Sequence, residues 1–263
     1  MSEKNVIPES INTALNNLLY PSSKIVGETI GNIFSMVFGS FNYFSEKVDY
    51  KRRQKYELLK KECDNKLKNI PEENLVIPNE QIIGQALENS KFCLDEEVLR
   101  NMFSSLIANS VNSNFATKVH PSFSTIISQM SPLDAQILIQ LKDINEIPCV
   151  KYIIYNNDDS YCVIHNNVFN PYIIGKDLYL YSSAIDSLCR LGLISVNYST
   201  CIKIDGIYDI FINSESFDLI KKTLCKPSEL KSANGSSPVS ADIVRGSLSL
   251  TDFGKNFLDV CYN

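Results

Sequence analysis

Apolar residues recur at the three-to-four spacing of amphipathic helices through the first half of the chain, up to about residue 144. An almost uncharged stretch at 24–44 predicts an apolar helix, and a charge-rich stretch at 50–68 predicts a second helix that ends at Ile70-Pro71. Further helices are expected from Pro78 to Ser90, from Asp95 as N-cap, from Pro121, and from Ser131-Pro132. This half is therefore expected to form a helical bundle.

Past residue 145 the pattern changes to short runs that favour strands, at 150–155 and 161–164. A helix at 182–194 closed by Gly192, a hairpin over 201–212 with Asp205-Gly206 at its turn, and a helix at 215–224 follow. The segment 226–242 is rich in Ser, Pro and Gly and is expected to be a mobile loop, followed by a strand and a last helix capped by Thr251. This order resembles a winged-helix domain over roughly 131–263.

The expected fold class is mainly α, with an N-terminal helical bundle followed by an α+β winged-helix-like domain. The expected division is a tail or short helix at 1–22, an apolar and a basic helix at 23–70, a bundle at 71–144, and the winged-helix-like domain at 145–263. Of the 263 residues, 44% are hydrophobic and 10% aromatic, which is enough apolar surface for packed cores and excludes a disordered chain.

The apolar helix at 24–44 allows two interpretations. Its only charge between residues 25 and 44 is Glu28, so its length suits a membrane span, although Asn32 and Asn42 would be costly in hydrocarbon. Small residues recur at every fourth position, where a second backbone can approach one helix face. These residues are Gly27, Gly31, Ser35 and Gly39. The helix is either a core helix or a helix for membrane contact or self-association.

The segment 50–68 carries eight basic and three acidic residues, a net charge of +5 within a chain of net charge −5. A charge-rich helix is commonly a solvated face, but a basic segment directly after an apolar helix also suits anionic lipid headgroups. The candidate residues for an anionic partner are Lys51, Arg52, Arg53 and Lys55. Nucleic acid is a further candidate partner here, and it would require an affinity that falls steeply with salt.

Cysteine and histidine spacing gives no metal site. The eight cysteines include no Cys-x-x-Cys pair, and the chain has two histidines, so neither a metal nor another cofactor is expected. The N-terminus lacks the features of a signal peptide, and the expected location is a reducing cytoplasm or, if the membrane hypothesis holds, a peripheral position at its inner membrane face.

DNA is not an expected partner of the C-terminal half. Residues 131–263 hold 11 basic and 15 acidic residues, and the helix in the position of a recognition helix carries Arg190 beside Asp186. Because phosphate neutralisation supplies most of the affinity for DNA, a protein-interaction or packing role is favoured for this half.

The central segment carries the most specific motifs: "LVIP" at 75–78, "DEEVLRNMFSSLIANSVNS" at 95–113 and "KVHPSFSTIISQMSPLDAQIL" at 118–138. Together they closely resemble the abortive-infection alpha family of bacterial antiphage proteins, from about residue 22 to 140 and more loosely in the tail. A "His-Pro-Ser-Phe" corner of that family is matched by His120, Pro121, Ser122 and Phe123. The resemblance implies a role in phage defence, in which an infected cell is sacrificed or arrested.

No catalytic constellation accompanies these motifs. His120 has Lys118, Ser122 and Ser124 nearby but no acid close in sequence, so a corner role with its imidazole bonded to a backbone carbonyl is expected instead of general-base catalysis. We therefore expect a protein that is not an enzyme. It would act through membrane contact or self-association of its N-terminal helices as a possible homo-oligomer. Alternatively, it is a soluble sensor or adaptor that binds a phage or host protein through the winged-helix-like domain.

Overall fold

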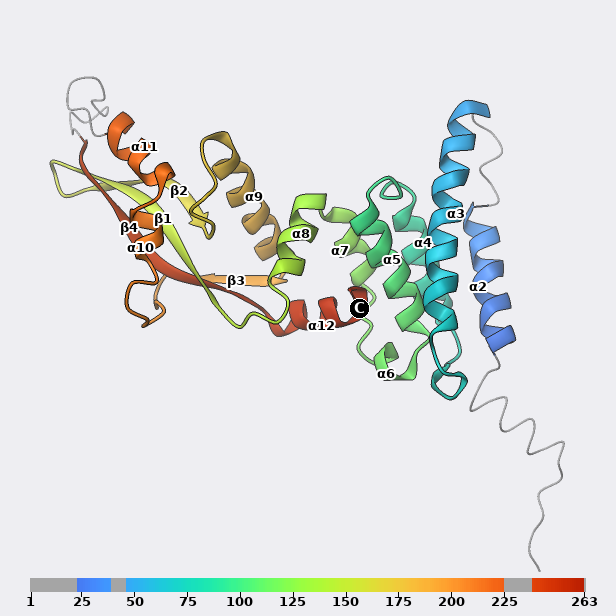
Figure 1. Cartoon of the computed structure of the whole chain (residues 1–263). Helices are drawn as coiled ribbons and strands as arrows, with labels where there is room; N and C mark the ends of the chain where they lie inside the picture. The colour runs from blue at the N-terminus through green and yellow to red at the C-terminus, as the bar shows by residue number, and fades with distance from the viewer. Residues whose placement is uncertain (1–22, 39–45, 225–237, 263) are drawn as a thin grey trace, which may run out of the picture. The chain divides into compact units, whose positions relative to one another are not determined.

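The computed structural model describes residues 23–38, 46–224 and 238–262, and the chain forms two compact units (Figure 1). Unit 1 comprises residues 1–132 together with 256–263, and unit 2 comprises residues 133–255. The chain leaves unit 1 at the first residue of helix α8 (Pro132–Gln140) and returns within helix α12 (Asp252–Cys261). Unit 1 is therefore discontinuous in sequence.

Unit 1 is all-helical in its described residues. Its elements in chain order are α2 (Ser23–Phe38), α3 (Glu46–Lys68), the 3-10 turn η1 (Glu72–Asn74), α4 (Glu80–Ser90), α5 (Glu97–Ser110), α6 (Ser113–Ala116) and α7 (Phe123–Gln129). Helix α5 is the central element, since it packs against α3, α4 and α7, and α2 packs on α4. Its side chains Met102, Phe103 and Ile107 are completely buried.

The helix starts of unit 1 follow local capping chemistry, with one correction. Asn79 caps α4 because its Oδ1 accepts hydrogen bonds from the backbone N–H groups of Gln81 and Ile82. The prediction that Asp95 caps α5 is wrong: Glu96 occupies the N-cap position without a side-chain cap bond, and Asp95 instead pairs with Lys55. The Asp95 carboxylate, which the local sequence predicted to cap α5, therefore forms a tertiary ion pair instead.

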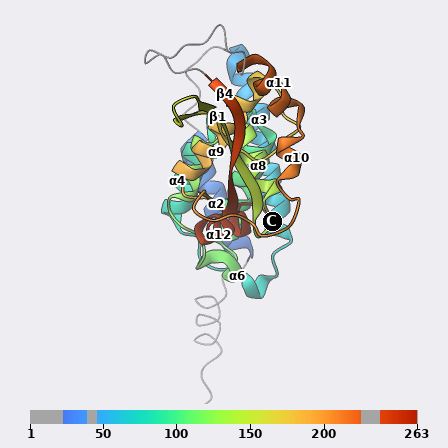
Figure 2. The same cartoon turned by 90° about the vertical axis from the view of Figure 1, so that its left-hand side faces the viewer.

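Unit 2 contains a four-stranded antiparallel sheet in the order β2-β1-β4-β3. Its strands are β1 (Ile147–Asn156), β2 (Tyr161–Val168), β3 (Ile194–Asn197) and β4 (Pro238–Leu250). Strands β1 and β4 pair along ten residues of β1 and run side by side in Figure 2. The predicted strand runs at 150–155 and 161–164 lie within β1 and β2, and Asp158 and Asp159 form their turn.

The helices of unit 2 are α8, α9 (Lys176–Arg190), α10 (Asp209–Ile212) and α11 (Glu215–Leu224), with the first turn of α12. Val150, Tyr152 and Ile154 alternate along β1 into a core shared with Phe211 and Phe217. The Tyr152 hydroxyl is satisfied inside this core by the hydroxyls of Ser214 and Ser216, at 3.1 and 3.3 Å.

The predicted hairpin over 201–212 is wrong. Residues 201–204 form no strand, and Gly206, at a φ of 77°, leads into helix α10. The apolar side chains Tyr208 and Phe211 have helical spacing, both are buried, and the Tyr208 hydroxyl donates to the Gly246 carbonyl at 2.8 Å. This half is therefore α+β, as predicted, but it lacks the hairpin predicted at 201–212. The winged-helix prediction is not confirmed.

Three further expectations about this half have clear outcomes. Gly192 closes α9 with a φ of 74°, although the helix begins at Lys176, well before the expected start. Thr251 caps α12, since its Oγ1 accepts from the Gly254 N–H at 2.9 Å. Of the expected mobile loop, residues 238–242 belong to β4, and 226–237 lie outside the described residues.

Candidate functional site

Helix α2 uses one of its faces to join the core of unit 1. Val26, Ile30, Ile33, Phe34 and Val37 are buried on that face, and the Phe34 ring lies 5.8 Å from that of Tyr56 on α3. Within its own unit, α2 is therefore a packed helix along its apolar stripe, as the core interpretation expects. Across the described residues, no helix is both long and apolar enough to cross a membrane.

The small residues of α2 lie away from that core. Gly27 and Ser35 are exposed, Gly31 is half-buried, and a Cβ atom built on either glycine would have no neighbouring atom within 4 Å. The Ser35 hydroxyl donates to the Gly31 carbonyl at 2.9 Å, so it presents little polarity of its own. The structure thus brings Gly27, Gly31 and Ser35 together as a narrow open strip, while Gly39 lies outside the described residues. We call these three residues the small strip.

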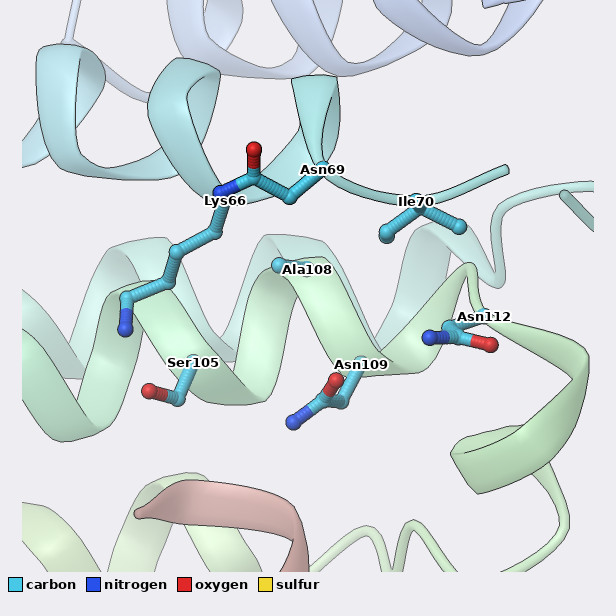
Figure 3. Close-up of a pocket in the computed structure, with 7 residues that line it drawn as sticks. All are labelled: Lys66, Asn69, Ile70, Ser105, Ala108, Asn109 and Asn112. Atoms are coloured by element: carbon cyan, nitrogen blue, oxygen red, sulfur yellow. The ribbon is translucent and has the colours of Figure 1, made fainter. Parts of the chain in front are cut away.

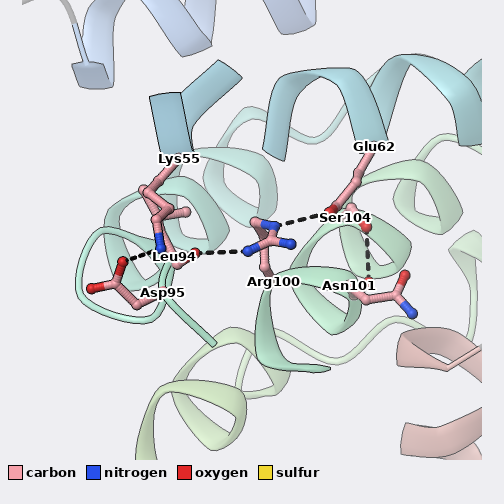
Figure 4. A network of polar contacts seen from close by, with 7 residues as sticks. All are labelled: Lys55, Glu62, Leu94, Asp95, Arg100, Asn101 and Ser104. Atoms are coloured by element: carbon pink, nitrogen blue, oxygen red, sulfur yellow. Dashed lines mark hydrogen bonds and ion pairs between the residues drawn. The ribbon is translucent and has the colours of Figure 1, made fainter. Parts of the chain in front are cut away.

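The basic segment is part of α3, but the side chains of Lys51, Arg52 and Arg53 lie outside what the structure describes. Lys55 is described, and its Nζ lies 2.5 Å from Asp95 Oδ1 (Figure 4). Its charge is thereby partly offset within unit 1, which makes Lys55 less available for an anionic partner than an unpaired lysine would be.

A partly buried ion pair links α3 to α5. Arg100 on α5 donates from Nε to Glu62 Oε1 at 2.8 Å and from Nη1 to the Leu94 carbonyl at 2.9 Å (Figure 4). The Arg100 side chain is 9% exposed and that of Glu62 is 28% exposed. This pair therefore fixes the α3 register on α5 in a partly desolvated environment.

The His-Pro-Ser-Phe corner is a structural turn before α7. His120 is exposed, and its Nδ1 accepts the Ser122 backbone N–H at 3.2 Å and lies 2.7 Å from Ser122 Oγ. The imidazole thus has a backbone N–H as one partner in this corner, and the expected bond to a backbone carbonyl stays a prediction. Phe123 is completely buried, and its ring packs edge-on against Phe257 at 5.2 Å.

Residues of α12 that belong to unit 1 are fastened beside this corner. Asn109 donates to the Val260 carbonyl at 2.7 Å, Asn256 donates to the Lys118 carbonyl at 2.9 Å, and Lys118 pairs with Asp259 at 3.2 Å. The motif segments 95–113 and 118–138 thus meet the chain end through polar bonds and through Phe123.

In a comparison with family models, the model of abortive infection alpha matches residues 51–261. This chain belongs to the abortive infection alpha family. The match begins within α3 and continues to the last residue of α12, so it includes both units but leaves out α2 and its small strip. The expected extent, from about 22 to 140 with a looser tail, is thereby corrected. No curated protein and no solved structure shows significant similarity to the chain.

Three buried thiols of this abortive infection alpha protein, those of Cys63, Cys149 and Cys261, are poorly suited to nucleophilic chemistry. Burial raises the pKa of Cys149 to about 12, and it also raises the pKa of Cys63 and Cys261. These groups are protonated near neutral pH. Among the described residues, no group of three or more His, Cys, Asp or Glu side chains could hold a metal ion.

Unit 2 of the abortive infection alpha chain carries a surface that the sequence patterns did not single out. Two cavities, of about 400 and 320 Å3, share Pro171 and Tyr172 as lining residues. Tyr172 is 84% exposed, and Ile144, Ile174 and Ile210 are exposed beside it. The signal available in the sequence was the run of apolar residues at 171–174, where a loop would normally be polar. We call Ile144, Tyr172, Ile174 and Ile210 the Tyr172 surface.

Proposed function

We propose that this abortive infection alpha protein acts in antiphage defence without catalysing a reaction, by self-association through the small strip of α2. The observation that carries the proposal is the open space around Gly27 and Gly31, on a helix whose apolar stripe is buried in unit 1. Small residues at this spacing allow a second helix backbone to approach closely. The occupant proposed is the same strip of a second copy.

Self-association is favoured over lipid contact by the character of the exposed residues around the strip. Lys24 and Glu28 form an exposed ion pair at 3.8 Å, and Asn32 is exposed on the same helix. Five apolar side chains of α2, those of Val26, Ile30, Ile33, Phe34 and Val37, are already buried in unit 1, so among the described side chains Ile25 is the large apolar one left exposed to acyl chains. Membrane contact through the basic residues of α3 is the alternative outcome of the test.

The test compares the oligomeric state of the full-length wild type with that of Gly31→Leu by sedimentation velocity. We expect wild type to associate and Gly31→Leu to sediment as a monomer, because an isobutyl group separates the two backbones. Bacteria that express Gly31→Leu should also lose protection in a phage plaque assay. A parallel membrane-potential measurement during infection reports whether the arrested cells are depolarised.

Gly84→Leu is the matched control. Gly84 lies on α4 and also has no atom within 4 Å of a built Cβ, so the same substitution there should leave association and protection unchanged. A monomeric wild type would contradict self-association. If that monomer also bound anionic vesicles and lost binding in Arg52→Glu/Arg53→Glu, the membrane alternative would replace it.

A second function, adaptor binding through unit 2, is favoured by the Tyr172 surface. The larger cavity beside Tyr172 is also lined by Asp209 and Glu215 and by no basic residue. An apolar patch with an acidic border suits a protein segment that combines an apolar anchor with basic residues. In this hypothesis the partner is a phage or host protein of that chemistry.

The adaptor hypothesis is tested with Tyr172→Ser/Ile210→Ser. A partner that is pulled down from infected cells by wild type should be lost from this variant, together with phage protection. Phe92→Ser is the control, since Phe92 is 89% exposed in unit 1 and lies far from this surface in sequence. Equal recovery of the partner by both variants would contradict the hypothesis.

A further inference from the structure

A polar cavity of about 220 Å3 lies in unit 1 between the last turns of α3 and α5 (Figure 3). Seven residues line it, all within the family match: Lys66, Asn69, Ile70, Ser105, Ala108, Asn109 and Asn112. It is separate from the small strip, the histidine corner and the Tyr172 surface. Its volume is below the range typical of drug-sized ligands, so it suits a small molecule.

The lining has one charge, and that charge is positive. Lys66 is half-buried and forms no ion pair with any described residue, and no acidic residue lines the cavity. In Figure 3 its side chain extends from α3 across α5 toward Ser105. A half-buried ammonium group without a counter-ion among the described residues favours an anionic ligand.

Ser105 gives independent evidence for a missing partner. It is 1% exposed, and its Oγ is a buried polar atom without a hydrogen-bond partner among the described residues. Neighbouring serines on the same helix behave differently: Ser104 and Ser110 donate to backbone carbonyls three residues earlier, at 2.8 and 2.7 Å. Because an unsatisfied buried hydroxyl is costly, its place on the wall of this cavity indicates a ligand that completes it.

The asparagines determine which groups remain for the ligand. Asn112 uses its Oδ1 to accept from the Asn114 N–H at 3.1 Å, so its amide N–H groups remain as donors. Asn109 uses its Nδ2 to donate to the Val260 carbonyl, so its Oδ1 remains as an acceptor. With Lys66 and Ser105, the cavity offers mainly donors and at least one acceptor.

The adjacent helix ends do not reverse this preference. The final turns of α3 and α5 present partial negative charge, but the carbonyls of the two lining residues in these turns are already bonded: Lys66 O accepts from Asn69 N–H at 3.2 Å, and Asn109 O accepts from Asn112 N–H at 3.3 Å. The side chains therefore set the chemistry of the cavity.

From these contacts we propose that the cavity binds a small oxyanion that also carries hydroxyl groups, with Lys66, Ser105 and Asn112 on the oxyanion and Asn109 on a hydroxyl. The oxyanion is either a phosphate monoester, as in a sugar phosphate, or a carboxylate, as in a hydroxy acid. This site is independent of self-association and would give the protein a small-molecule input.

Calorimetric titration of the full-length protein tests the proposal with four probes: ribose 5-phosphate, inorganic phosphate, glycerate and ribose. We expect saturable binding of ribose 5-phosphate or of glycerate, whichever oxyanion is preferred, weaker binding of inorganic phosphate, and none of ribose. Lys66→Gln should weaken the binding of the preferred probe by roughly tenfold or more, because a charge-assisted hydrogen bond is lost.

Two further variants separate ligand binding from folding. Lys68→Gln removes an exposed charge two residues away that does not line the cavity, and it should bind as wild type does. Ser105→Ala should leave the melting temperature of the unliganded protein unchanged or raise it, since no protein bond is lost, and yet weaken binding. The proposal is overturned if neither oxyanion probe binds, or if Lys66→Gln and Lys68→Gln bind the preferred probe equally.

Discussion

Gly254 is a single residue on which the junction between β3 and α12 depends. A Cβ atom at this position would overlap the backbone carbonyl group of Leu193, so no side-chain rotation could relieve the clash. We therefore expect Gly254→Ala to lower the free energy of unfolding by about 3 kcal/mol or more. Urea denaturation of the full-length protein measures this change.

Gly27→Ala is the matched comparison on another helix. Because nothing lies within 4 Å of a Cβ built on Gly27, the higher helix propensity of alanine should stabilise α2 by about 0.5–1 kcal/mol. Equal effects of the two substitutions would show that the close approach at Leu193 is absent in solution.

His165 should make unit 2 sensitive to acid. It is buried on β2, its ring lies 4.4 Å from that of Tyr179, and burial lowers the pKa of its imidazole below the ordinary value of 6.5. The unfolded chain therefore takes up a proton at a higher pH than the folded chain, so stability is retained above pH 6.5 and falls as the pH drops below it.

The expected result is a smaller fall in the unfolding midpoint of His165→Gln than of wild type between about pH 7.5 and about pH 5.5. Thermal denaturation monitored by circular dichroism at both pH values measures it. An identical pH dependence in the two proteins would contradict the assignment to His165.

At the scale of elements, the Arg100–Glu62 pair fixes α3 to α5. Arg100→Leu leaves the Glu62 carboxylate partly buried without its partner, and we expect a loss of about 2–4 kcal/mol in urea denaturation. The double variant Glu62→Leu/Arg100→Leu should be less destabilised than Arg100→Leu alone, because no unpaired charge remains.

The Lys55–Asp95 pair gives the comparison for that prediction. The Asp95 side chain is 80% exposed, so Lys55→Ala should cost less than about 1 kcal/mol. If Glu62→Leu/Arg100→Leu were as unstable as Arg100→Leu alone, the unpaired Glu62 carboxylate would not be the cause of the loss of stability in Arg100→Leu.

At the level of single elements, the sequence predicted the ends and caps of helices better than it predicted how the segments pack in three dimensions. The ends of α4 at Ser90 and of α9 near Gly192, and the cap of α12 at Thr251, follow from local chemistry and agree with the expectations. The prediction of a hairpin at 201–212 was wrong because Asp205-Gly206 is compatible with several kinds of turn. Helix α10 forms here because Tyr208 at its N-cap and Phe211 within it are buried against the sheet, and this tertiary contact is not visible in the local sequence.

The same reasoning explains what was predictable about the candidate sites. The small strip has a period that is visible in the sequence, whereas its open side depends on which face of α2 the core takes. The cavity at Lys66 and Ser105 joins residues about forty positions apart on two helices, so no local pattern could reveal it.

At the scale of the whole molecule, unit 1 depends on residues from both ends of the described chain. Phe257 is completely buried against Phe123, so Phe257→Ala should destabilise unit 1 by about 3–5 kcal/mol. In hydrogen exchange, we expect the amides of α5 and α7 to lose more protection than those of β1 and β4. Equal losses in both units would show that the two units unfold together.

This closure of unit 1 by α12 also sets an order of events during synthesis. Phe123 leaves the ribosome long before Phe257 exists, and at usual translation speeds the interval is on the order of 10 s. During that time the hydrophobic site for Phe257 has no occupant from its own chain, although unit 2 has all of its residues once Lys255 is made. A nascent chain that is interrupted anywhere in unit 2 would carry an unfinished unit 1, exposed to chaperones and proteases. Unit 1 can therefore be completed only after all of unit 2 has been translated.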